Sequence, residues 1–418
     1  MKLTELLDQH KRVVLVALFL VSFCLRLGLT LYEYNTKGTT RWSDAFHYLD
    51  IGERFAEGDF YPPFGPDGYT IVGPVTPLLV AGAKMLFGSP VWPLLILNCL
   101  LGALLVYVLY GLGARLISNA GGIALALWSV FNFSLIRFCY QILKEPLVIL
   151  LLPLIILCLL KAKDLKRPVL NLIISSLAFS VLVHTDERFF VYAPAFLLLI
   201  LILSGKKDKL RHAVLWLLVL LLSMVPWTLR NYKQHGELVL LTPRTTAITS
   251  KFWGSNLVDL FTEDRIKTKL ILGPKEHAIE VGQNNEAIPR RYGAFEKYLK
   301  SWQHYWQPTY FKLHFIQYGF RPVKWSFAHN LSSLVFYGLF LPFYLAGFVW
   351  AFRKKEWLVT FLALLPFLHG LMHTAMIWSL ERYRLPLNFL VALVAIWFVK
   401  QMYDSFRKRR IGAAGGIA

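Results

Sequence analysis

The feature that most constrains this chain is a series of apolar runs, each about as long as a membrane is thick. A helix of about 20 apolar residues crosses a bilayer, and an α-helix satisfies its own backbone hydrogen bonds in lipid. The chain is therefore predicted to be an all-α, polytopic membrane protein with about ten transmembrane helices. The runs lie near 13–31, 92–113, 120–139, 146–161, 169–184, 189–204, 212–229, 331–352, 357–376 and 385–402.

Positive charge indicates how these runs are oriented. The chain has 45 Lys and Arg against 25 Asp and Glu, a net charge of +20. In a soluble protein this excess would suggest a nucleic-acid partner, but here the basic residues gather in short loops, as cytoplasmic loops do. We therefore predict a multi-pass protein of a bacterial inner (plasma) membrane with both termini cytoplasmic and no nucleic-acid partner. The basic clusters are Lys11 with Arg12, 161–167, 206–211, 353–355 and 407–410.

One shorter apolar run, residues 74–88, is interpreted as a helix that lies on the outer membrane surface. It contains Pro77 and Lys84, and counting it as a span would place the basic C-terminus outside. The chain then divides into three parts. Residues 1–229 form a transmembrane module with a first external loop at 32–91, residues 230–330 a large external region, and residues 331–418 the last helices and a basic tail.

The first external loop contains an acidic amphipathic segment that is too polar for lipid. On a helix beginning at Asp44, the side chains of Asp44, His47, Asp50 and Glu57 lie near one face. Ser43 is the predicted N-cap, so Asp44 falls in the first turn, where the helix dipole favours its ionised form. The segment thus predicts a charged carboxylate beside the membrane that can act as a base.

Several basic residues fall next to spans on the predicted outer side, against the usual trend. An anionic ligand at the outer face would explain them together, and phosphate suits guanidinium groups because both bond in bidentate geometry. Alternatively, each residue snorkels or pairs with a nearby acid such as Glu145, Glu187 or Glu381. The set as a whole favours a phosphate-bearing lipid. Its members are Lys84, Arg137, Lys144, Arg188, Arg230, Lys233, Arg382 and Arg384.

Ionisable groups also border the apolar runs at two places. Lys144 and Glu145 precede a helix start, and residues 184–188 (HTDER) form a tight turn between two spans. Such positions are functional candidates, although turns are polar in any case. His369 and His373, one helical turn apart, are interpreted as hydrogen-bonded structural groups rather than metal ligands or a proton relay.

An ordered set of short motifs runs along the chain. The motifs are Ser43-Asp44 with Tyr48 and Asp50; Gly68 to Pro77 with Phe87-Gly88; Asn98 with Leu101-Gly102, Tyr110 and Arg115; Lys144-Glu145; Pro226-Trp227 with Arg230-Asn231-Tyr232; and Arg382 to Pro386. In this order they resemble the C-type glycosyltransferases, which use polyprenyl-phosphate sugars, and the likeness is closest to the branch with protein O-mannosyltransferases and lipid A aminoarabinose transferases. The likeness covers most of residues 1–260 and 375–400, while 260–330 resembles nothing identified, and the additional C-terminal periplasmic domain of some relatives is not expected.

The resemblance implies inverting transfer of a sugar from a polyprenyl phosphate to a hydroxyl of a lipid, glycan or protein at the extracytoplasmic face. By matching position, Asp44 would be the catalytic base. The donor phosphate would be held by Lys84, Arg230, Arg382 and Arg384. We add His47, Asp50, Lys144, Glu145, Arg188, Asn231 and Tyr383 as candidate substrate-binding residues. No cofactor is expected, because a base and cations suffice, though Asp44, His47 and Asp50 leave a divalent metal as an open alternative.

Two other functions remain open at this point. A transporter or flippase for a lipid-linked sugar could use the same cations, but it favours repeat symmetry and charged or broken helices at the midplane. The runs are apolar through their middles and no two halves match. An O-antigen-type ligase or polymerase would account for the late external region but gives the Asp44 motif no role. A non-catalytic interaction role explains neither the acidic helix nor the external arginines.

Overall fold

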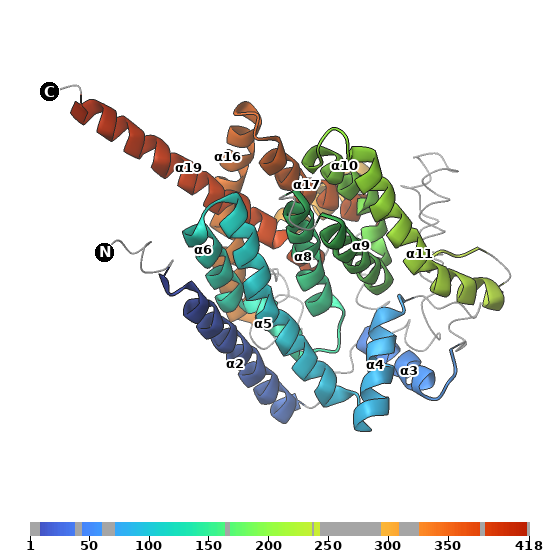
Figure 1. Cartoon of the computed structure of the whole chain (residues 1–418). Helices are drawn as coiled ribbons and strands as arrows, with labels where there is room; N and C mark the ends of the chain where they lie inside the picture. The colour runs from blue at the N-terminus through green and yellow to red at the C-terminus, as the bar shows by residue number, and fades with distance from the viewer. Residues whose placement is uncertain are drawn as a thin grey trace.

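The computed structural model is a bundle of α-helices (Figure 1). Within the described ranges every regular element is helical and none is a strand, as the sequence predicts. The all-α, membrane-spanning fold class is thereby confirmed. The structure describes residues 9–37, 44–60, 72–163, 168–235, 238–242, 294–308, 326–376 and 381–415.

Eight helices in these ranges are long and apolar enough to cross a membrane. Seven are single α-helices, and the eighth, which covers Asn330–Arg353, joins the end of α15 (Ser326–Ser333), the π-helical turn η5 (Leu334–Gly338) and α16 (Phe340–Arg353). The seven are α2 (Lys11–Lys37), α5 (Val91–Leu116), α8 (Glu145–Lys163), α9 (Pro168–Thr185), α11 (Lys209–His235), α17 (Trp357–Met376) and α19 (Asn388–Gly415).

Two of the ten predicted spans have a different form. The run at 120–139 is a pair of helices, α6 (Asn119–Phe131) and α7 (Phe133–Arg137), which with η1 (Phe138–Tyr140) forms a span bent by 51°. The run at 189–204 is a 3₁₀ turn, η2 (Glu187–Tyr192), followed by the short helix α10 (Ala193–Leu203). The number of ten spans therefore stays a prediction, compatible with this arrangement.

The bend between α6 and α7 has a local cause at Asn132. This residue leaves the helical conformation, with φ −72° and ψ 101°, and its side-chain oxygen accepts the N–H of Ser134 at 3.1 Å. The hydroxyl of Ser332 accepts the neighbouring N–H of Phe133 at 2.9 Å. Because side chains satisfy the N–H groups that the helix would otherwise bond, a new helix begins at Phe133.

Helix α8 lies at the centre of the bundle, between α5 and α9 (Figure 1). Its sequence is apolar on every side, which is the pattern of a fully surrounded helix. Leu152, Ile155 and Ile156 are completely buried. By contrast, α2 and α11 leave many Val and Leu side chains exposed, as helices that face lipid do.

A buried charge inside α2 is compensated by neighbouring helices. The Arg26 guanidinium donates to the carbonyl and hydroxyl of Ser22, at 3.2 and 2.5 Å, and to the carbonyl of Ser129 on α6 at 3.0 Å. Gly102 on α5 makes room for it, because a Cβ there would overlap the Arg26 side chain. The sequence-based view of this span as apolar throughout is corrected here: it contains a charge that ties α2 to α6.

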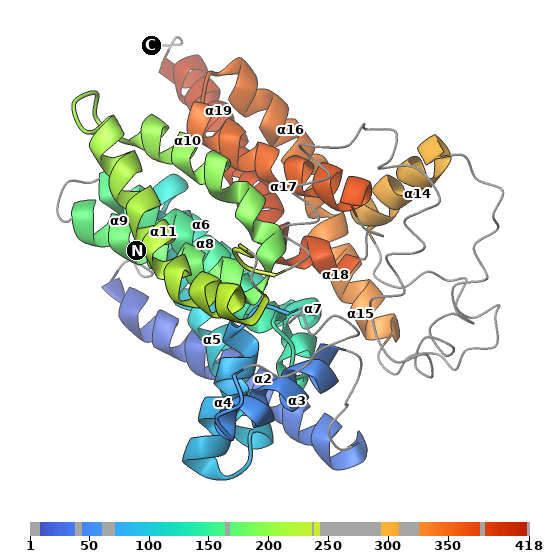
Figure 2. The ribbon, with the colours of Figure 1, turned by 90° about the vertical axis from the view of Figure 1, so that its right-hand side faces the viewer.

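The acidic segment forms a helix that begins at Asp44, as predicted. This helix, α3 (Asp44–Ala56), buries Tyr48, Ile51 and Phe55, while the predicted cap Ser43 lies outside the described residues. It packs side by side with α4 (Val75–Phe87) at one end of the bundle (Figures 1 and 2). Helix α4 ends at Gly88, whose φ of +73° favours glycine.

Most of the predicted external region 230–330 lies outside the described residues. Helix α14 (Ala294–Trp306) belongs to it and packs on α17 and on the short helix α18 (Glu381–Arg384) (Figure 2). The Tyr305 hydroxyl donates to the carbonyl of Pro366 on α17 at 3.2 Å. The late part of this region is thus anchored to the last helices of the bundle.

Candidate functional site

A buried carboxylate, Asp186, holds two cations where α9 ends. The Arg188 guanidinium donates to both of its oxygens, at 2.7 and 2.5 Å, and the Lys144 ammonium lies 3.1 Å from the second. The side chain of Asp186 is 3% exposed, and those of Lys144 and Arg188 are each 15% exposed. We call these three residues the cation cluster.

Local sequence explains how the cluster forms. Asp186 is the N-cap of η2, in extended conformation, and its side chain also accepts the backbone N–H of Arg188 at 3.3 Å. Lys144 directly precedes α8, so the starts of two helices meet at one carboxylate. Burial alone would raise the pKa of Asp186, but Arg188 and Lys144 outweigh it and hold this pKa well below its usual range. Likewise, burial opposes the charge on Arg188, but Asp186 raises the pKa of that guanidinium above its ordinary value.

Aromatic rings from the C-terminal helices cover the guanidinium of Arg188. The ring of Tyr383 lies 4.3 Å from its central carbon, in cation–π geometry. The His373 ring also stacks on Tyr383, with centroids 5.0 Å apart. His369 Nε2 is 2.9 Å from the carbonyl oxygen of Tyr383. Helices α17 and α18 thereby place an ordered column of rings against the cluster.

A small polar pocket lies among these residues, and we call it the polar pocket. Its volume is ≈ 10 Å³. Two cations, two carboxylates, two imidazole rings, one phenol and three apolar side chains line it. The lining residues are Lys144, Glu145, Val148, Asp186, Arg188, Phe189, His369, His373, Tyr383 and Pro386.

Helix α3 carries Asp44 to the same end of the bundle. Tyr48, one turn after Asp44, is buried. Burial and then the charge of Asp44 raise the pKa of the Tyr48 phenol well above its ordinary value, and the carboxylates of Glu145 and Asp186 add to the shift. Tyr48 therefore stays a neutral hydroxyl that is influenced by the Asp44 carboxylate and by two carboxylates that line the polar pocket.

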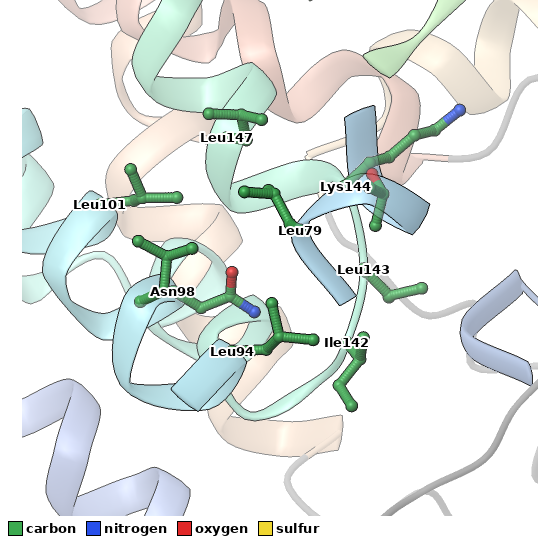
Figure 3. A pocket seen from close by; sticks show the side chains of 10 residues that line it. Leu79, Leu94, Asn98, Leu101, Ile142, Leu143, Lys144 and Leu147 are labelled. Carbon is green, nitrogen blue, oxygen red and sulfur yellow. The ribbon is translucent and has the colours of Figure 1, made fainter. Parts of the chain in front are cut away.

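An apolar pocket of ≈ 20 Å³ lies on the other side of Lys144. Leucine side chains from α4, α5 and α8 surround it, among them Leu79, Leu94 and Leu147 (Figure 3). The Lys144 ammonium points away from these leucines (Figure 3). Lys144 lines both pockets, so an apolar and a charged space meet at this residue.

The structure brings together four of the predicted substrate-binding residues: Lys144, Glu145, Arg188 and Tyr383. Two others, His47 and Asp50, lie on α3. His47 contacts the ring of Phe46 with centroids 6.1 Å apart, and Asp50 lies 3.8 Å from Arg54 on a partly exposed face.

Arg230 and Asn231 join α11 to two loops. The Arg230 guanidinium donates to the carbonyl of Phe60 at 2.9 and 2.6 Å and lies over the ring of Trp227 at 4.6 Å. Asn231 donates to the carbonyls of Val239 and Leu241 at 3.0 and 3.1 Å. These contacts position the end of the first loop, and phosphate binding by Arg230 stays a prediction.

Two other predicted phosphate ligands, Arg384 and Lys84, contact residues outside the cation cluster. Arg384 is buried, donates to the carbonyls of Tyr305 and Gln307 at 2.5 and 2.7 Å, and stacks on Tyr337 at 3.6 Å. Lys84 pairs with Glu57 at 3.2 Å near the outer end of α4. Arg382 is on α18, but its side chain lies outside the described residues.

Metal binding finds no support in these side chains. Among the described residues, no three His, Cys, Asp or Glu side chains are grouped so as to hold a metal ion. The expectation that the reaction uses no metal stays a prediction.

Comparison with known proteins agrees with this architecture. The model of the family described as dolichyl-phosphate-mannose-protein mannosyltransferase matches residues 71–229, which include the cation cluster. No curated protein matches the chain. The oligosaccharyltransferase of Archaeoglobus fulgidus, in its apo form, superposes with a TM-score of 0.58 at 16% identity over 96% of this chain and 52% of that one. The chain has the fold of the C-type glycosyltransferases.

Two further solved structures are similar to this chain. Archaeal AglB from Archaeoglobus fulgidus, in complex with an inhibitory peptide and a dolichol-phosphate, matches with a TM-score of 0.57 at 15% identity, over 98% of this chain and 52% of that one. ArnT from Cupriavidus metallidurans, bound to undecaprenyl phosphate, matches with a TM-score of 0.48 at 15% identity, over 99% and 63%. The chain spans about half the length of the oligosaccharyltransferases it matches.

Sequence reasoning leaves two side chains of this site without a specific role. The turn at 184–188 is a candidate region as a whole, and nothing in the sequence singles out Asp186 as the residue that organises the cation cluster. Tyr48 enters only as part of a motif. The available signal was the concentration of ionisable residues at 184–188, directly between two apolar runs.

Proposed function

We propose that the chain is a membrane glycosyltransferase that moves a sugar from a polyprenyl-phosphate carrier to an acceptor hydroxyl at the extracytoplasmic face. The observation that carries this proposal is that α3, which bears Asp44, packs in one apolar cluster with Ile142 and Leu143, the two residues directly before Lys144 of the cation cluster. The charges of Asp44 and Asp186 both raise the pKa of Tyr48 on α3. The acceptor hydroxyl belongs to a lipid, a glycan or a protein.

The two pockets suit the two ends of such a donor. Lys144 and Arg188 supply the positive charge that a phosphate needs, and Arg188 offers a planar fork of donors. The leucine-lined pocket on the other side of Lys144 suits the first apolar units of a prenyl chain. A donor phosphate would take the place of Asp186 as the partner of these cations. Sequence-based candidates Lys84, Arg230, Arg382 and Arg384 remain predictions for the same role.

The proposed reaction needs one base and one stabilised leaving group. The Asp44 carboxylate takes the proton of the acceptor hydroxyl as its oxygen forms a bond to the anomeric carbon. The bond between that carbon and the phosphate oxygen breaks, and the electron pair leaves with the polyprenyl phosphate. Lys144 and Arg188 stabilise the charge that develops on it. Attack opposite the leaving group inverts the anomeric configuration.

Replacing Asp44 tests this proposal directly. We expect Asp44→Asn to lower kcat for sugar transfer by about 10²- to 10⁴-fold, because the base is lost while the size of the side chain is kept. The measurement is transfer of labelled sugar from a panel of polyprenyl-phosphate donors in membranes, together with donor binding, which should persist. Glu53→Gln is the matched control, since Glu53 is an exposed acid on the same helix. Transfer by Asp44→Asn at the wild-type rate would exclude Asp44 as the base.

A further inference from the structure

The polar pocket contains buried polar atoms whose hydrogen-bonding capacity is unused. Glu145, His369 and His373 are 6%, 1% and 4% exposed, and all three line this pocket. Within the part of the chain that the structure describes, Glu145 Oε2 and the Nδ1 atoms of both histidines have no hydrogen-bond partner. Buried polar atoms are nearly always paired, so three in one small pocket indicate a polar ligand.

The two imidazole rings are held in fixed orientations. His369 Nε2 bonds the carbonyl of Tyr383, and the His369 ring stacks on Phe189 with centroids 5.6 Å apart. The His373 ring lies between His369 and Tyr383, at 4.3 and 5.0 Å. Their Nδ1 atoms therefore cannot turn away to find partners elsewhere.

The chemistry of these atoms defines what the ligand must offer. A carbonyl accepts, so Nε2 of a neutral His369 carries the proton and its Nδ1 is an acceptor. Glu145 Oε2 is an acceptor when the carboxyl is ionised. The ligand must then supply hydrogen-bond donors, and hydroxyl groups fit this need. Val148, Phe189 and Pro386 provide an apolar wall suited to the C–H face of a sugar ring.

We propose that the polar pocket is the sugar subsite of the donor, where Glu145 and His373 bind sugar hydroxyls and thereby determine which sugars are accepted. This inference rests on the proposed function. The cations at one side of the pocket take the phosphate, and the three unpaired atoms take the ring. The pocket volume of ≈ 10 Å³ is about that of one water. A ring therefore enters when the phosphate draws Lys144 away from Asp186.

The test pairs a residue change with a ligand change. Transfer by the purified full chain in lipid nanodiscs is measured with the donor that the wild type accepts and with its monodeoxy analogues. We expect one deoxy analogue to lose about 10- to 100-fold in kcat/KM with the wild type. With the parent donor, the kcat/KM of the His373→Phe variant should be lower than that of the wild type by a similar factor. With the deoxy analogue, the kcat/KM of this variant should fall no further. A purely structural role for His373 would lower transfer from all donors by one common factor.

A second variant and a control keep the test decisive. Glu145→Gln keeps the size of the side chain. This variant should likewise no longer distinguish the parent donor from the analogue that lacks one particular hydroxyl. His212, whose Nδ1 lies 2.9 Å from the Ser204 hydroxyl, is outside the pocket, and His212→Phe should leave the deoxy pattern unchanged. If both pocket variants keep the wild-type deoxy pattern while transfer proceeds, the sugar subsite is wrong and the proposed function stands. If the wild type transfers no sugar from any donor, both proposals fail.

Discussion

At the scale of single residues, the cation cluster depends on one carboxylate. Asp186 compensates two largely buried positive charges, Arg188 and Lys144. Removing one partner of a buried ion pair leaves an uncompensated charge, which typically costs about 3–5 kcal/mol. Asp186 is therefore expected to matter for folding as well as for the site.

We expect Asp186→Asn to lower the free energy of unfolding by about 3–5 kcal/mol at neutral pH. The folded-state pKa of Asp186 lies below its unfolded value, so its contribution is complete above the ordinary carboxyl pKa of about 3.9 and fades as pH falls below it. Unfolding curves at several pH values check this, and a deficit that already vanishes at pH 6 would contradict it. Asp404→Asn, which breaks the exposed Lys400–Asp404 pair, should cost no more than about 1 kcal/mol.

Residue-level roles were only partly predictable, because a guanidinium bonds carbonyl, carboxylate and phosphate oxygens alike. The sequence indicated that Arg188, Arg230 and Arg384 lie near the outer face. It could not indicate that Arg230 and Arg384 bond main-chain carbonyls while Arg188 bonds a carboxylate. Those partners come from segments between 2 and 170 residues away. Only the fold determines which of them each arginine reaches.

At the scale of elements, the position of α3 depends on its close approach to α4. A Cβ on Gly52 would lie 2.7 Å from the carbonyl oxygen of Pro77 and overlap the side chain of Val80. The two helices can therefore pack tightly only because position 52 has no side chain. Asp44 and Tyr48 are on the same helix, so their placement depends on this contact.

Gly52→Ala is expected to destabilise the fold by about 1–3 kcal/mol, as overpacking does, and to reduce transfer by displacing α3. Gly82→Ala is a matched control on α4, because nothing lies within 4 Å of its Cβ position. Alanine there should be neutral or stabilise the helix by up to about 1 kcal/mol. Thermal unfolding and transfer rates of both variants decide the matter, and equal behaviour would mean that α3 is not held by Gly52.

The elements themselves were the most predictable part of the fold. Apolar runs and the start of α3 at Asp44 follow from patterns within one turn or one span. The bend at Asn132 did not follow, because it depends on one side-chain oxygen replacing a carbonyl and on Ser332, 200 residues later. The shortness of α10 did not follow either, because the aromatic and apolar residues 189–192 at the end of η2 continue into the apolar run of the helix after it.

At the scale of the whole molecule, α3 and α4 lie at one end of the bundle and the C-terminal end of α19 at the other (Figure 1). Basic residues at the α19 end and between α16 and α17 indicate the cytoplasmic side. The proposed site is then extracytoplasmic, which remains a prediction from charge.

Cysteine labelling in intact cells checks this sidedness. In a Cys24→Ser background, whose three other cysteines are buried, Asp59→Cys should react with a membrane-impermeant maleimide from outside. Lys355→Cys, between α16 and α17, should react only after the cells are permeabilised. The reverse pattern would place the acidic helix in the cytoplasm and overturn the proposed face of the reaction.

The approach of Gly73 to the end of α9 has a consequence for how such a protein can diversify. A Cβ at position 73 would overlap the carbonyl oxygen of His184, two residues before Asp186. The two backbones are in direct contact here. The distance between the first external loop and the cation cluster is therefore determined by main-chain atoms and not by a side chain. Exposed residues of α3 can therefore be substituted to suit different acceptors. In the proposed reaction, the base and the leaving group keep the same relative position.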